Sequence, residues 1–192
     1  MKSKVKNKND MRYIKNERKL RGALNALNAK RRLRLQVREV CRKADVKPPT
    51  FYWRYKNIDD AMTKIEQELY DDFRITIKNT KSTNLKPILV TMMIYISKNS
   101  DYFLSLQRRG DIYLLNKMIN SIRDILTSSW TSYGKVNDNH IFQIYSATLI
   151  GAILDWGKNT KYNSNSIEKY LKILLRLSEN PPKHLKSIVY EK

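Results

Sequence analysis

The chain has 192 residues, and its 41% hydrophobic content is enough for a packed core, which excludes a disordered tail. Its formal net charge is +20, and residues 1–56 hold 19 Lys or Arg against 4 Asp or Glu, a net charge of +15. This asymmetry favours a polyanion partner for the N-terminal part, and the single Cys41 excludes an intramolecular disulfide and suits a reducing cytoplasm.

Local patterns predict an all-α chain, because no sustained alternation and almost no hairpin signals occur. Residues 1–9 carry four Lys residues and are expected to form a flexible basic arm. Asp10 can cap a first helix that ends near Lys30. The apolar stripe of that helix is Leu20, Ala23, Leu24 and Leu27. A basic cluster that ends at Arg34 follows, and we expect it to face phosphate.

The stretch 35–62 predicts two short helices joined by a sharp turn. The apolar face of the first helix is Val37, Val40, Cys41 and Ala44. Asp45 falls at the turn, where the left-handed backbone is needed and Asp tolerates it better than most residues. Pro48 and Pro49 fit only the first turn of a second helix, which begins near Lys47. Such a pair forms the helix-turn-helix unit that lays its second helix in the major groove of DNA.

Two runs in this stretch carry a family resemblance. They read Val-Arg-Glu-Val-Cys-x-x-Ala-x-Val and, three residues later, Thr-Phe-Tyr-x-x-Tyr-Lys-Asn-x-Asp-Asp. They are similar to the DNA-binding domain of the TetR family of bacterial transcriptional regulators, over about residues 10–70. The sequence departs from the family pattern at Gln36, Lys47, the Pro48-Pro49 pair and Ile58, so the bases that are read stay open.

The resemblance implies a set of DNA contacts. Thr50 and Tyr52 are expected at phosphates, and Lys47, Trp53 and Arg54 at the groove or the backbone. The complete predicted set is Arg34, Gln36, Arg38, Lys47, Pro48, Thr50, Tyr52, Trp53, Arg54 and Lys56. The resemblance therefore predicts a DNA-binding domain over residues 10–56.

The remaining chain predicts further helices. Asn57 and Asp60 form a capping pattern for a connecting helix over 57–79. A polar linker at 79–84 leads to a larger helical domain over 80–180, and a tail follows at 181–192. Within that domain, we expect helices at 85–99, 101–107, 111–130, 139–158 and 166–177.

The helix over 139–158 has apolar residues on more than one face, so one face can serve the core and another can be buried elsewhere. With the helix over 166–177 it is expected to form a four-helix bundle with a second copy, although a monomer core is the alternative. The predicted dimer-interface residues are Tyr145, Leu149, Ala152, Ile153, Trp156, Tyr170 and Leu174.

The pattern Tyr-x-x-x-Leu-Ile-Gly-x-Ile-x-x-Trp over 145–156, with Asp-Tyr-Phe near 101, resembles the C-terminal domain of dihydroxyacetone-kinase regulators of the TetR type. That resemblance implies an effector pocket between helices. The aromatic residues that we expect to line it, unless they are plain core, are Tyr95, Phe103, Tyr113, Trp130 and Tyr145.

The sequence shows no pattern typical of an enzyme or of a cofactor or metal site. His140 and His184 are isolated, and no Gly-rich phosphate loop or nucleophile elbow occurs. The apolar run 141–154 is too short for a bilayer. We therefore predict a cytoplasmic, homodimeric transcriptional regulator, typically a repressor, which binds an inverted repeat in double-stranded DNA. Whether a small-molecule effector releases or engages it stays open. The alternatives are an architectural DNA binder and a helical protein-interaction module with a basic end.

Overall fold

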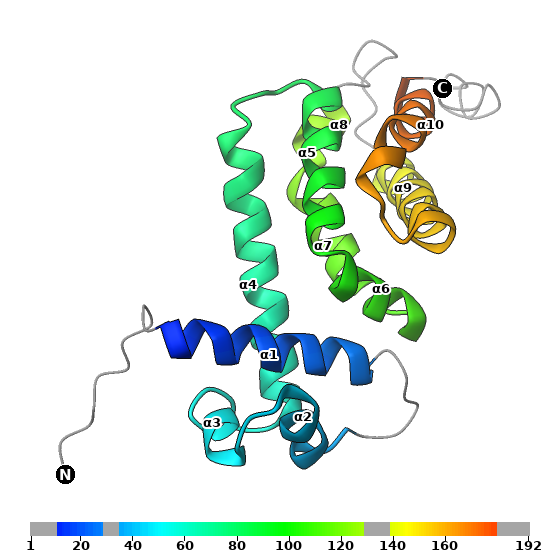
Figure 1. Cartoon of the computed structure of the whole chain (residues 1–192). Coiled ribbons are helices and arrows are strands. Elements are labelled where there is room, and N and C mark those ends of the chain that lie inside the picture. The colour runs from blue at the N-terminus through cyan, green and yellow to red at the C-terminus, as the bar shows by residue number, and fades with distance from the viewer. Residues whose placement is uncertain (1–10, 29–34, 129–138, 180–192) are drawn as a thin grey trace. The chain divides into compact units, whose positions relative to one another are not determined.

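The computed structural model describes residues 11–28, 35–128 and 139–179, in which every regular element is a helix (Figure 1). The helices are α1 (Met11–Asn28), α2 (Val37–Ala44), α3 (Pro48–Tyr52), α4 (Ile58–Asn79), α5 (Leu85–Lys98), α6 (Ser100–Arg109), α7 (Tyr113–Ser121), α8 (Arg123–Ser128), α9 (Asn139–Thr160) and α10 (Ile167–Glu179), with a 3-10 turn at Ser164–Ser166. The all-α prediction is confirmed for these residues. The predicted basic arm at 1–9 and the tail at 181–192 lie outside them.

The chain divides into two compact units, unit 1 (residues 1–68) and unit 2 (residues 69–192). The division falls within α4. The predicted boundaries differ, because 57–79 is predicted as a connecting helix between a domain that ends at residue 56 and one that begins at residue 80.

In unit 1, α1 packs against α2, and α2 packs against α3. The stripe predicted on α1 supplies Leu20, Ala23 and Leu24, which are at most 4% exposed, and these join a core formed by Val40, Cys41, Ala44, Phe51, Ala61 and Ile65. Each fully buried Leu contributes about 1.5–3 kcal/mol relative to an exposed one. This small core holds the three N-terminal helices together.

The start of α4 is fixed by the capping pattern predicted around Asn57. The Asp60 N–H donates to Asn57 Oδ1 at 2.8 Å, and the Lys56 N–H donates to the Asp60 carboxylate at 2.8 Å. The first bond satisfies a backbone donor that the helix leaves without an intrahelical partner, and the second ties the residue before the cap to the first turn of α4. The hydrogen bond from the Lys56 backbone, followed by that from the Lys64 ammonium, lowers the pKa of Asp60, so the cap stays charged at neutral pH.

In unit 2, α5 is buried over much of its surface, and α10 packs against both α5 and α9. The hydroxyl of Tyr95, which is on α5, donates to the Leu69 carbonyl at 2.6 Å. Phe103, Trp156 and Tyr162 form an aromatic cluster in which the Trp156 and Tyr162 ring centroids are 5.1 Å apart. The core of unit 2 is therefore built from aromatic as well as aliphatic side chains.

The helix predicted over 111–130 is two helices in the structure, α7 and α8, which are separated at Ile122. Ile122 has φ −109° and ψ 16°, outside the helical region, and the Ser121 hydroxyl donates to the Met118 carbonyl at 2.7 Å. Ser side chains compete in this way for carbonyls that a continuing helix would use. The apolar stripe continues across the break, because Ile122 and Leu126 are both buried.

The turn from α9 to α10 is unusual in its backbone. Lys161 and Tyr162 have φ of 53° and 59°, a region that side chains other than Gly, Asn and Asp rarely adopt. The conformation places the Tyr162 ring in the core with 1% exposure, and its hydroxyl donates to Gln107 Oε1 at 3.3 Å. Burial of the ring and this contact offset the backbone strain. Desolvation raises the pKa of Tyr162 to about 12.

Candidate nucleic-acid interface

The candidate interface is formed by α2, the turn after it, and α3. Asp45 ends α2 in the left-handed conformation, with φ 52° and ψ 52°, as its place in the sequence predicts. The Val46 N–H closes the turn by donating to the Cys41 carbonyl at 3.0 Å. Pro48 and Pro49 then occupy the first positions of α3. A tight turn between two short helices is thereby fixed by local sequence alone.

α3 is anchored from beneath by two aromatic rings. Phe51 is fully buried and Tyr55 is 5% exposed, with their ring centroids 5.3 Å apart. Tyr52 and Trp53, on the other side, are 57% and 67% exposed. Large aromatic side chains that are left this open on a monomer surface are typical of a contact surface.

Most of the predicted DNA contacts lie on the surface around α2 and α3. The exposed ones are Gln36, Arg38, Lys47, Pro48, Tyr52, Trp53 and Lys56, and Thr50 is half-buried. Arg34 lies outside the described residues. Arg42 and Lys43 are also exposed on α2 but were not among the predicted contacts. Their place off the apolar face of α2 was visible in the sequence and would have been enough to include them.

The structure does not support Arg54 as a DNA contact. Its side chain is 5% exposed, pairs with the Glu17 carboxylate at 3.1 Å, and donates to the Tyr13 carbonyl. Its guanidinium carbon lies 3.5 Å from the centroid of the Tyr13 ring. Because these partners on α1 occupy the guanidinium, Arg54 holds the end of α3 against α1 and does not face solvent. Glu17 also pairs with Arg21 at 3.1 Å, so the contact is part of a network.

Cys41 lies under this surface and is 2% exposed. Burial raises the pKa of its thiol, so the thiol stays protonated at neutral pH. This agrees with its predicted place on the apolar face of α2.

The residues predicted at the dimer interface are mostly inside a single chain. Tyr145, Leu149, Ile153, Trp156, Tyr170 and Leu174 are each at most 5% exposed, and Ala152 is half-buried. Because α9 and α10 turn the six buried side chains toward the core of unit 2, these six have almost no surface left for a second copy. The wide apolar arc of α9 left its inward face undetermined at the sequence level.

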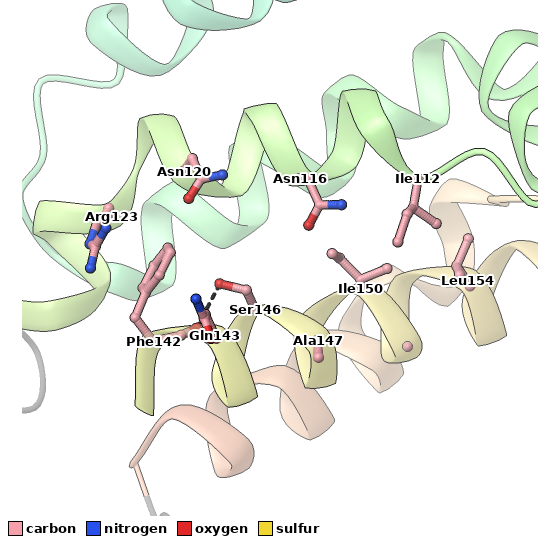
Figure 2. Close-up of a pocket in the computed structure, with 11 residues that line it drawn as sticks. Ile112, Asn116, Asn120, Arg123, Phe142, Gln143, Ser146, Ala147, Ile150 and Leu154 are labelled. Carbon is pink, nitrogen blue, oxygen red and sulfur yellow. Dashed lines mark hydrogen bonds between the residues drawn. The ribbon is translucent and has the colours of Figure 1, made fainter. Parts of the chain in front are cut away.

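The predicted pocket aromatics do not meet around a cavity. Tyr95, Phe103 and Tyr145 are buried in the core, Tyr113 is 61% exposed, and Trp130 lies outside the described residues. A groove is present elsewhere in unit 2, between α7 and α9, and none of the four described aromatic residues lines it (Figure 2).

Comparisons with protein-family models, curated proteins and solved structures give no significant match. None of the helices in the described ranges combines the length and hydropathy that a membrane span requires. The described ranges also contain no group of three His, Cys, Asp or Glu side chains that is placed to hold a metal ion. The surface around α2 and α3 is therefore the candidate functional site.

Proposed function

We propose that this chain is a DNA-binding transcriptional regulator of the TetR type that uses α2 and α3 as a helix-turn-helix. The observation that carries the proposal is the two-sided character of α3. Phe51 is fully buried, whereas the neighbouring Tyr52 and Trp53 are more than half exposed. A five-residue helix that is anchored on one side and open on the other can enter a groove without disturbing its own core.

The charge around α3 supports a nucleic-acid partner. Arg38, Arg42, Lys43, Lys47 and Lys56 are all exposed in the elements that flank Tyr52 and Trp53. Such cations give affinity through phosphates, whereas base edges are read by side chains that enter the groove. We assign the phosphate role to these cations, to Thr50 and to Tyr52, and the reading of bases to Trp53.

The proposal includes a homodimer, because two half-sites specify more base pairs than one. The second copy has to contact side chains that one chain leaves exposed, such as Thr148 on α9 and Ile173, which is 41% exposed, on α10. Replacing Ile173 by Glu is expected to weaken the dimer, measured by sedimentation velocity. An unchanged sedimentation coefficient would remove α10 from the proposed interface.

The experiment that tests the function is selection from randomised duplex DNA at two salt concentrations. Enrichment of an inverted repeat supports the regulator. Salt-sensitive binding without an enriched sequence refutes it and favours an architectural DNA binder, and absence of duplex binding favours a protein-interaction module. The log-log salt slope gives the number of phosphates contacted, at about 0.9 per phosphate.

A matched pair of variants locates the surface. Tyr52→Ala is expected to lower the affinity for the selected duplex about tenfold, since hydrogen bonds to charged groups contribute about 1.5–3 kcal/mol. Tyr113→Ala is the control, because Tyr113 is similarly exposed but lies in unit 2. Equal losses in both variants would contradict the assignment of α3.

A further inference from the structure

An open groove of about 500 Å³ runs between α7 and α9, within unit 2. Figure 2 shows the two helices antiparallel, with Ile112 opposite Leu154 at one end and Arg123 beside Phe142 at the other. Leu154 lies 12 positions after Phe142 on one continuous helix, which is about 18 Å at about 1.5 Å per residue. The groove is thus elongated, which suits a linear ligand.

The two sides of the groove differ in chemistry. Asn116 and Asn120 line the α7 side, and Figure 2 shows both amides directed toward the space between the helices. Ile150 and Leu154 provide apolar surface on the α9 side. A ligand that fits needs hydrogen-bonding groups along the edge that faces α7, and apolar groups that reach Ile150 and Leu154.

The spacing of the two asparagines matches an extended peptide. Residues four apart on a helix are about 6 Å apart along its axis. An extended chain presents equivalent peptide groups on one edge every two residues, or about 6.6 Å. An Asn amide has both a donor and an acceptor, so it can bond the N–H and C=O of one residue of an extended chain, which lie on the same edge. Alternate side chains of such a peptide stand at right angles to that edge and point into the groove, where Ile150 is only 5% exposed.

The Arg123 end adds a charge. Among the described residues that line the groove, Arg123 is the only charged one, and its guanidinium carbon lies 4.4 Å from the centroid of the Phe142 ring. Stacking on an aromatic face orients a guanidinium for bidentate binding of a carboxylate. Gln143, which follows Phe142, adds a further amide beside this end.

We propose that this groove binds a short extended peptide through its backbone and its free C-terminal carboxylate. The carboxylate pairs with Arg123, the backbone bonds Asn116 and Asn120, and apolar side chains at alternate positions contact Ile150 and Leu154. At about 3.4 Å per residue, the groove holds about five residues. An acyl carboxylate has no groups for the two asparagines, and a helix of a second copy has its backbone amides bonded within itself.

This proposal concerns unit 2 alone and does not depend on DNA binding. The probe is a pool of synthetic pentapeptides that are labelled with fluorescein at the N-terminus, with Leu, Ile or Val at alternating positions and Ser between them. Binding to the full chain is followed by fluorescence anisotropy. The same pool with an amidated C-terminus tests the carboxylate without any change to the protein.

The expected result is binding of the free-acid pool with a Kd on the order of 10 µM, and at least about tenfold weaker binding of the amidated pool. Asn116→Ala combined with Asn120→Ala, and separately Arg123→Gln, are expected to weaken free-acid binding at least about tenfold. The matched controls are Asn84→Ala and Arg108→Gln, which replace exposed residues of unit 2 outside the groove and should stay within about twofold of wild type.

Absence of free-acid binding at about 1 mM would overturn the proposal. Equal binding of the amidated pool, or unchanged binding by the double asparagine variant, would overturn it as well. If dodecanoate raises the melting temperature of the chain and the peptides do not, the groove takes an acyl chain and the peptide assignment fails. The comparison of the free-acid and amidated pools uses wild-type protein, so it stays decisive even if a variant fails to fold.

Discussion

Replacement of Gly157 by Ala sets two effects of known sign against each other. Gly157 is buried near the end of α9, and an added Cβ would lie 2.5 Å from Gln107 Oε1 and closer still to the Tyr162 ring. Within a helix, Gly to Ala alone stabilises by about 0.5–1 kcal/mol. Overpacking a well-filled core costs about 1–3 kcal/mol.

The steric effect is expected to prevail here because neither neighbour can move away cheaply. The Tyr162 ring is 1% exposed and packs against Trp156 with centroids 5.1 Å apart, and the Gln107 amide donates to the Leu154 carbonyl at 2.5 Å. Subtracting the helix term from the packing term leaves a loss of about 1–2 kcal/mol. This corresponds to a fall in Tm of about 3–6 °C for a chain of this size.

The assay is thermal unfolding of the full chain followed by circular dichroism. Gly151→Ala is the matched control on the same helix, because nothing lies within 4 Å of its added Cβ. It should raise the free energy of unfolding by about 0.5–1 kcal/mol. Gly22→Ala, which is equally open on α1, checks that self-association through α9 does not mask the result. If Gly157→Ala is as stable as Gly151→Ala, the packing of Tyr162 against Gly157 is wrong.

Three further predictions test the remaining parts of the structure. Arg54→Gln should lower the stability of unit 1 by about 2 kcal/mol, because it breaks a buried ion pair, and should leave the salt slope of duplex binding unchanged. Arg38→Gln should reduce that slope by about 0.9. The reverse pattern in salt titrations would return Arg54 to the interface. The pKa of Tyr162 is about 12 in the folded chain, against an ordinary 10.0, so this difference contributes about 3 kcal/mol to the free energy of unfolding. The contribution is complete below pH 10 and is lost as the pH rises to 12. Urea titrations should show that Tyr162→Phe lacks this loss. Cys41 should react with a disulfide reagent at least about a hundredfold more slowly than a free thiol, until denaturant opens unit 1, and fast labelling of the native chain would contradict its burial.

Helix positions followed from the sequence because periodicity and caps are local. The stripe on α1, the capping residues at Asn57 and Asp60, and the left-handed Asp45 each depend on neighbours within a few positions. The helix break at Ile122 was not predicted, because the apolar stripe keeps its helical spacing across the break. A hydroxyl that bonds a carbonyl leaves no trace in hydropathy.

Features that depend on distant residues were not predicted. Arg54 looks like any other cation of the basic end, and its partner Glu17 lies 37 residues earlier on another helix. Tyr162 carries no signal of a left-handed turn, because a buried ring and not the residue's own preference holds it there. The inward face of α9 is a matter of packing, which an apolar pattern around most of a helix cannot specify.

The paired prolines at the start of α3 have a consequence for how a polyanion can approach. Pro48 and Pro49 have no N–H groups, and the Thr50 N–H donates to the Lys47 carbonyl at 2.9 Å. The backbone at this end therefore has almost no donors left for an incoming phosphate, although helix starts commonly supply them. Recognition at this end therefore has to come from side chains. Because the backbone contributes little to the affinity, a single side-chain substitution on this surface is expected to change the affinity strongly.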